Sequence, residues 1–249
     1  MTPTDLISKE ADAELQSLAA RYAKAGGVGL QVLNMLGGQA ENLLERLPDP
    51  VKSGLEGATE RALHVALETA QHSRTRIPDA APWLNRAVTT AMGAAGGFGG
   101  LPSALTELPV TTTILLRTIQ GIAEENGFDP AEEAVRLECL HVFAAAGPLE
   151  QDDGANMAFL AARVTLTGST VQGLIARIAP RLATVFGQKL AAQAVPVLGA
   201  AAGAATNYAY TSYYQEMAAV HFGLKRLARD HGVSEDILLE RLKLALSKS

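Results

Sequence analysis

The side chains best suited to chemistry in this chain of 249 residues are a glutamate at position 107 and a histidine at position 221. A carboxylate and an imidazole can work together as general acid and base when both lie within hydrogen-bond reach of one substrate. Thr111 or Thr113 would then supply a hydroxyl. Because 114 positions separate Glu107 from His221, the spacing does not by itself bring them together. A hydrolase-like enzyme that uses Glu107 and His221 is therefore one hypothesis.

The familiar signatures of hydrolytic and metal chemistry are missing. The chain has no nucleophile elbow, no zincin helix motif and no cysteine–histidine pairing. Its one cysteine, Cys139, cannot form an intramolecular disulfide or a zinc site alone, and helical periodicity predicts that it is buried. His64 and His72 are interpreted as surface or interface histidines. We therefore expect no metal site and no cofactor.

A proline marks the start of a helix that carries one isolated cation. Pro109 biases the residue before it away from helical geometry, so Glu107 is predicted to lie just outside the helix. There the helix dipole favours a carboxylate. One face of the helix is polar, with side chains spaced four, three and four residues apart. These are Thr113, Arg117, Gln120 and Glu124. Arg117 either pairs inside the fold or binds an anionic head group or substrate.

A second polar stripe is predicted on a later helix that is otherwise rich in alanine, threonine and methionine. At 100° per residue its members fall within about 60° of one line. They are Asn207, Tyr210, Tyr214, His221 and Lys225. Three interpretations stay open: a hydrogen-bonded seam between helices, a wall that contacts a ligand, or a catalytic face. Arg226 follows the stripe and lies close to the predicted end of the helix near Gly232.

Glycines dominate the middle of the chain between Gly93 and Gly100. No Gly-Lys-Ser/Thr ending follows them, so a phosphate-binding loop is not indicated. The order Gly-Gly-Phe-Gly-Gly-Leu-Pro predicts instead a bend between two helices packed face to face, which is a glycine-rich helical hairpin. Gly199 and Gly203 have the four-residue spacing found where helices pack closely.

Composition and charge narrow the class of protein. A net charge of −5 and a pI near 5.6 give no basic footprint, so nucleic acid is not an expected partner. Acidic residues in the first 20 positions are the reverse of a signal peptide, so a cytoplasmic location is expected. Two uncharged runs, 87–106 and 190–215, are long enough to cross a bilayer, but their small residues favour buried core. A basic helix with Arg177, Arg181 and Lys189 could meet anionic lipid.

Helical periodicity extends along the whole chain and predicts an all-α, bundle-like single domain of roughly nine or ten helices. N-terminal helices are expected over 1–82, a core over 83–232 and a C-terminal amphipathic helix over 233–249. The individual helices are predicted at 4–25, 29–47, 51–76, 109–125, 130–146, 155–167, 170–194, 199–231 and 235–246, and a further helix is expected between Trp83 and the glycine segment. Gly26, Gly27 and Gly29 are expected to separate the first two.

Four blocks of the sequence resemble the EcsC family. They are residues 96–127, residues 137–147, VPVLGAAAGAATNYAY at 195–210 and MAAVHFGLKRLARDHG at 217–232. The resemblance implies an all-helical bacterial protein close to a membrane, with a name that derives from a gene associated with an ABC exporter. It assigns no catalytic residue. The residues that match its motifs are Glu107, Pro109, Thr111, Arg117, Asn207, His221 and Arg226.

We therefore expect a membrane-associated or lipid-binding helical protein linked to transport or envelope processes. Its partners would be an anionic lipid surface, to which it is peripheral or in which it is partly inserted at the inner membrane, and by resemblance an ABC-type transporter. The alternatives are the hydrolase-like enzyme and a scaffold protein without catalysis. The candidate functional cluster is Glu107, Thr111, Thr113, Arg117, Asn207, Tyr214, His221 and Arg226.

Overall fold

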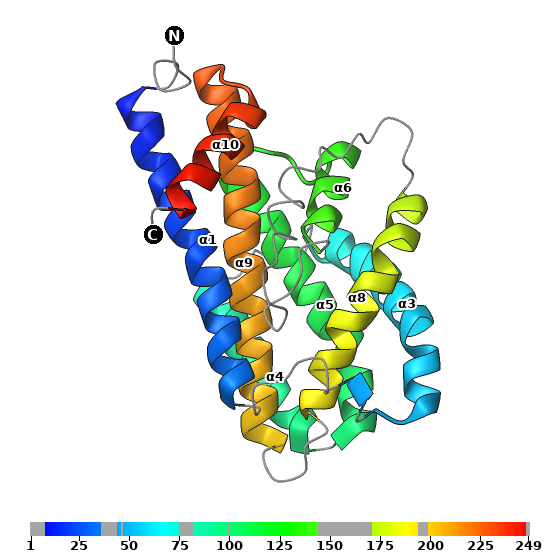
Figure 1. Cartoon of the computed structure of the whole chain (residues 1–249). Helices are drawn as coiled ribbons and strands as arrows, with labels where there is room; N and C mark the ends of the chain where they lie inside the picture. The colour runs from blue at the N-terminus through cyan, green and yellow to red at the C-terminus, as the bar shows by residue number, and fades with distance from the viewer. Residues whose placement is uncertain are drawn as a thin grey trace.

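The computed structural model describes residues 8–35, 44–45, 47–74, 82–98, 100–143, 171–193 and 199–247. Within these ranges the chain forms helices and no strand (Figure 1). The helices are α1 (Lys9–Met35), α3 (Asp49–Arg74), α4 (Pro82–Phe98), α5 (Gly100–Glu125), α6 (Glu133–Val142), α8 (Val171–Gln193), α9 (Gly199–His231) and α10 (Glu235–Leu246). The prediction of an all-α, bundle-like fold is confirmed.

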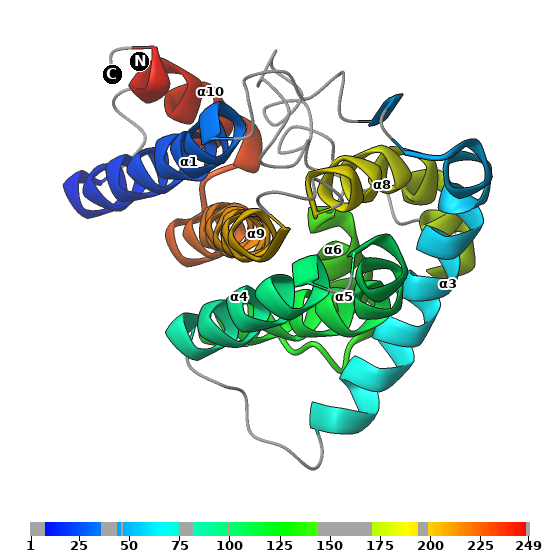
Figure 2. The same ribbon diagram turned by 90° about the horizontal axis from the view of Figure 1, so that it is seen from below.

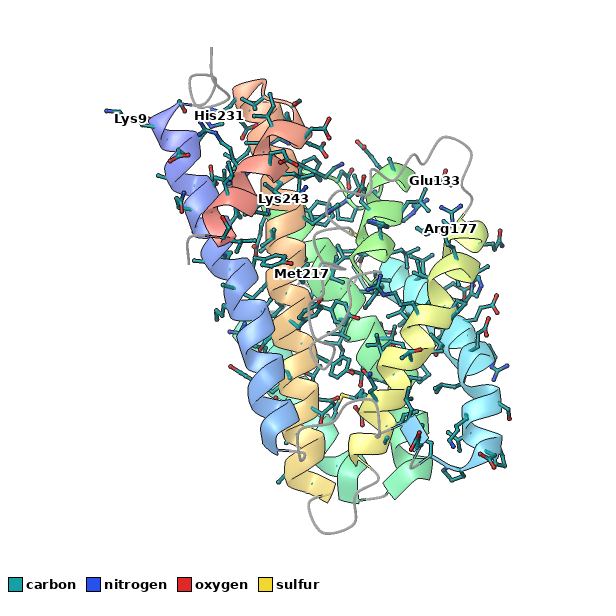
Figure 3. All side chains as sticks on the ribbon, in the orientation of Figure 1. Lys9, Glu133, Arg177, Met217, His231 and Lys243 are labelled. Atoms are coloured by element: carbon teal, nitrogen blue, oxygen red, sulfur yellow. The ribbon has the colours of Figure 1, made fainter. Side chains whose placement is uncertain are left out.

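Helix α9 is the centre of the bundle. It has 33 residues, and it contacts α1 along one side and α4 along another. Figure 2 shows α9 lying between α1 and α4, with α5 and α8 on its inner side and α3 at the outer edge beyond them. Met217, in the middle of α9, is fully buried, and Figure 3 marks its place. Every functional side chain discussed below lies on α9 or on a helix that touches it.

Glycine allows α4 to approach α9 at backbone distance. A Cβ atom placed on Gly93 of α4 would lie 2.2 Å from the carbonyl oxygen of Gly203 on α9. A contact this short requires glycine, as the Gly199/Gly203 spacing predicts for close helix packing. The bend at Gly99 between α4 and α5 lies outside the described residues, so the glycine-rich hairpin stays a prediction.

The last two helices begin and end as their sequences predict. Gly232 follows α9 with a φ of 63°, a left-handed conformation that glycine adopts without strain. Ser234 then caps α10, where its side chain accepts a hydrogen bond from the backbone N–H of Ile237. Gly127 ends α5 in the same left-handed conformation, with a φ of 77°.

Three predicted boundaries were wrong. Helix α1 continues through Gly26 and Gly27, because glycine costs only about 1 kcal/mol in a helix interior and packing against α9 outweighs that cost. Pro109 lies inside α5, so Glu107 is within a helix and not outside one. Residues 130–132 form a turn, and α6 begins only at Glu133. Proline and glycine bias the backbone at these positions, but tertiary contacts decide it.

None of the helices in the described ranges has both the length and the apolar composition that crossing a membrane would require. The predicted helix at 155–167 lies outside the described residues. Of the predicted helix at 29–47, residues 29–35 form the end of α1, and most of the remainder lies outside the described residues. The helix predicted at 170–194 is confirmed as α8.

Candidate functional site

Glu107 lies in the interior, where helices α5, α8 and α9 meet. One carboxylate oxygen, Oε1, accepts three hydrogen bonds: from Thr111 Oγ1 at 2.8 Å, from Lys189 Nζ at 3.2 Å and from Asn207 Nδ2 at 2.6 Å. Lys189 is only 2% exposed and Glu107 only 8%. The cluster therefore ties three helices together through one acceptor.

The charges of this cluster are set by opposing effects. Burial raises the pKa of Glu107, but the charge of Lys189 and the hydrogen bonds from Asn207 and Thr111 outweigh burial and leave that pKa below its ordinary value. Burial also lowers the pKa of Lys189, and the charge of Glu107 opposes that shift only in part. Glu107 is therefore ionised at neutral pH and acts only as an acceptor.

The polar network continues from Asn207 into α4. Asn207 Nδ2 also donates to the backbone oxygen of Thr89 at 2.7 Å, and the hydroxyls of Thr89 and Thr211 lie 2.8 Å apart. Glu107 lines neither of the two cavities described below. The arrangement fixes the register of α4, α5, α8 and α9 and offers no access for a substrate through those cavities.

His221 belongs to a different cluster. Its Nε2 lies 2.7 Å from Oε2 of Glu138 on α6, and Lys225 Nζ donates to the other oxygen of Glu138 at 3.0 Å. Burial raises the pKa of Glu138, but the hydrogen bond and charge of His221, with the charge of Lys225, bring it down to about 2. The sequence analysis missed Glu138, although a lone carboxylate within the apolar LECLHV segment is a usable indication.

Glu107 and His221, the two residues of the hydrolase hypothesis, therefore lie far apart. Glu107 binds Asn207 and Glu138 binds His221, and these two α9 residues are separated by about 21 Å along the helix axis. Angular periodicity correctly placed Asn207 and His221 on one face, but it carries no constraint on which carboxylate meets each. The structure does not bring Glu107 and His221 to one substrate.

The remaining predicted residues have structural contacts. Thr113 donates its hydroxyl to the backbone oxygen of Pro109 in its own helix, and Tyr210 donates to the backbone oxygen of Val185 at 2.7 Å. Tyr214 is buried with its ring 5.2 Å from that of Phe143. The stripe on α9 is thus a hydrogen-bonded and aromatic seam between helices, which is the first of the three interpretations.

The cations predicted to meet lipid lie in different environments. Arg117 is half-buried on α5 and lines neither described cavity. Arg177 is exposed near the beginning of α8 (Figure 3), but Lys189 of the same helix is buried against Glu107. The prediction that Lys189 belongs to a basic surface on α8 is therefore wrong. This lysine is buried because it forms an ion pair with the interior carboxylate of Glu107.

A polar cavity of about 450 Å³ does open among α1, α4, α5 and α9. Four cations and three carboxylates are among its lining residues. These are Arg21, Lys24, Arg86 and Arg226, with Glu14, Glu125 and Glu216. Of the eight residues in the predicted cluster, only Arg226 lines it.

Most charges in this cavity are paired with one another. Glu216 accepts hydrogen bonds from Arg21 at 3.0 Å and from Lys24 at 2.7 Å. Arg226 forms an ion pair with Glu14 and donates to Asn126 Oδ1 at 3.1 Å. These contacts join α1 to the C-terminal half of α9.

Arg86 differs from the other three cations of the cavity. It donates to the neutral side-chain oxygen of Gln215, and no carboxylate of the described residues lies within ion-pair distance of it. Arg86 is also the only charged residue of α4. The sequence offered one indication of it, because Arg86 borders the long uncharged run that ends at Glu107.

A shallow apolar groove adjoins this cavity, and Arg86 lines both. The other residues of the groove come from α4 and from the N-terminal half of α9. They are Ala87, Thr90, Ala91, Ala94, Ala204 and Tyr208. The polar cavity and the apolar groove therefore meet at one arginine.

Among the described residues, no group of three or more histidine, cysteine, aspartate or glutamate side chains could hold a metal ion.

In the comparison with known proteins, a family model described as the EcsC protein family matches residues 30–227. The predicted resemblance is confirmed. No curated protein and no solved structure gives a significant match.

Proposed function

This chain belongs to the EcsC protein family, and we propose that it is a peripheral membrane protein that binds lipid through the outward face of α4. The observation that supports this proposal is an apolar helix face left open to solvent. Leu84 and Val88 are 39% and 42% exposed, and Ala91 and Ala95 continue the same face. A contiguous apolar surface of this kind marks a site of interaction with a membrane or a protein.

The opposite face of α4 holds the helix in place. Thr89 and Gly93 are buried against α9, through the hydroxyl contact with Thr211 and the close approach to Gly203. Since α4 is anchored by that face, its outer face is free to contact another apolar medium. Figure 2 shows α4 at the periphery of the bundle, next to α9.

One neighbouring side chain extends the apolar surface onto α9. Tyr208 is 45% exposed and lines the groove together with residues of α4. Aromatic rings with a polar end are enriched where membrane and water meet. Transfer of Leu84 and Val88 out of water would contribute on the order of 1 kcal/mol each, which suits reversible association. The exposed members of the uncharged runs, Val88, Ala91 and Ala95 in one and Tyr208 in the other, would then contribute a surface that lies on the bilayer.

From its family we also propose an ABC-type transporter as a partner. Binding to a transporter would place the chain at the same membrane surface, so this proposal is compatible with lipid binding. If the chain is instead a scaffold protein, the outer face of α4 should bind another protein and should not bind lipid vesicles.

Flotation with phosphatidylcholine vesicles and with anionic phosphatidylglycerol vesicles tests the proposal, each at low and high salt. The variant Leu84→Glu/Val88→Glu should lower the floated fraction at least tenfold, because it places two charges on the apolar face. Val65→Glu is the matched control, since Val65 is a 48% exposed valine on α3. Equal flotation of the double variant and wild type would contradict the proposal, as would absence of flotation for wild type.

A further inference from the structure

The apolar groove and the polar cavity lie on one continuous face of α9. At 100° per residue, five of their seven α9 residues fall within about 60° of one line. These are Ala204 and Tyr208 in the groove, and Gln215, Ala219 and Arg226 in the cavity. The other two, Glu216 and Gly223, lie about 40–60° further round, on the side of α1. Together the two features form a trough with α9 as its floor, α4 as one wall and, at the polar end, α1 as the other.

The apolar groove holds most of the length of one lipid chain. Along α4 it runs from Arg86 to Ala94, a rise of about 12 Å. The hydrocarbon core of a bilayer is about 30 Å thick, so a single acyl chain spans about 15 Å. The walls match this use, because Ala87, Ala91 and Ala94 offer small apolar side chains.

The charge at the junction matches one anionic head group. Within the described chain, Arg21 and Lys24 are paired with Glu216, and Arg226 with Glu14, whereas Arg86 has only the neutral amide of Gln215. One guanidinium without a carboxylate can bind a singly charged carboxylate through two parallel hydrogen bonds. The junction therefore favours a ligand with one negative charge at the end of one chain.

We propose that the trough binds a long-chain fatty acid, with its carboxylate on Arg86 and its chain along the groove between α4 and α9. This inference rests on the proposed function, which it makes specific in ligand and place. Because the outer face of α4 lies beside the groove, a fatty acid can pass sideways between the bilayer and the trough.

Binding of tetradecanoate to the full-length protein below its micellar concentration, measured by titration calorimetry without vesicles, tests the inference. We expect one saturable site. Arg86→Gln should weaken binding at least tenfold, since a hydrogen bond to a charged group contributes about 1.5–3 kcal/mol. Arg177→Gln is the matched control, because it removes an exposed arginine from α8 and should bind as wild type does.

Two further ligands and one further variant test separately the contributions of the carboxylate head group and of the hydrocarbon chain to binding. Octanoate and tetradecanol should each bind at least tenfold more weakly than tetradecanoate, the first for lack of chain and the second for lack of charge. Ala91→Trp fills the groove at an exposed position and should weaken tetradecanoate binding while Arg86 stays in place. Unchanged binding by both Arg86→Gln and Ala91→Trp would overturn the inference, as would tighter binding of lysophosphatidylglycerol, which would assign the head to a phosphate.

The two proposals fail in different ways. Saturable tetradecanoate binding without flotation would contradict the membrane surface on α4 and support the trough. Flotation that depends on Leu84 and Val88, without any binding of tetradecanoate in solution, would overturn the trough and support the surface.

Discussion

Two faces of α9 differ in whether the charged side chains that lie against them are paired with an opposite charge. The seam face, which carries Asn207 and His221, is turned inward and meets the carboxylates of Glu107 and Glu138. The trough face, which carries Tyr208 and Gln215, is rotated by about 120° at 100° per residue and meets Arg86. On the seam face each charge has a partner of opposite sign, and on the trough face one cation has none among the described residues.

This difference distinguishes structure from function. The ion pairs of the seam, Glu107 with Lys189 and Glu138 with His221, hold the helices in register and already satisfy these charged groups. A cation held beside an apolar groove without a carboxylate is an incomplete interaction, and a ligand can complete it. Residues with unusual chemistry in the sequence therefore belong here to the seam, and the proposed ligand site uses a less conspicuous arginine.

Breaking the interior ion pair should give the largest effect on stability. Lys189→Met leaves the buried carboxylate of Glu107 without its cation, and removal of one partner of a buried pair costs about 3–5 kcal/mol. Urea denaturation should show this loss in the free energy of unfolding. The double variant Glu107→Leu/Lys189→Met should recover most of it, and a double variant as unstable as the single one would contradict the assignment of the pair.

Acid should weaken the second carboxylate cluster next. The pKa of Glu138 is lowered from 4.5 to about 2 in the folded chain, so its contribution is present above pH 4.5 and is lost as the pH falls toward 2. The shift corresponds to at most about 3 kcal/mol. Glu138→Gln should flatten the dependence of the free energy of unfolding on pH within that window. An equally steep dependence in the variant would show that other carboxylates cause it.

A methyl group between α4 and α9 tests how firmly the trough wall is held. Gly93→Ala places a Cβ against the carbonyl of Gly203 and should destabilise the fold by about 1–3 kcal/mol. Gly54→Ala is the control, because a Cβ there meets nothing within 4 Å, and it should stabilise α3 by up to about 1 kcal/mol. Thermal unfolding of both variants gives the comparison, and equal melting temperatures would show that α4 adjusts freely.

The smallest effect on stability is expected at Arg86. Arg86→Gln leaves no carboxylate of the described residues without a partner, but it removes the hydrogen bond to Gln215. The free energy of unfolding should therefore fall by about 1 kcal/mol, less than at Lys189. The same variant should lose tetradecanoate binding, which sharpens the contrast with Lys189→Met. A loss of stability at Arg86 comparable to that at Lys189 would remove the distinction between the two faces.

The sequence predicted the helical class, the capping of α10 and the polar stripe along one face of α9, because these depend on local periodicity and on capping residues. It did not predict the continuity of α5 through Pro109 or the pairing of Glu107 with Lys189, which are 82 positions apart. It also missed the trough, since Arg86 becomes notable only when α1, α4 and α9 are placed around it. Periodicity gives the face of a residue, whereas its partners depend on how helices are packed in space.

The length of α9 has a consequence for the speed and affinity of recognition. Its 33 residues form a rod of about 50 Å, clamped by Glu107 of α5 near one end and by Glu14 of α1 near the other. A rod fixed at both ends keeps the trough floor in its bound shape before any ligand arrives. The conformational entropy of the site is then lost during folding and not on association, so recognition should proceed as lock-and-key, with little induced fit.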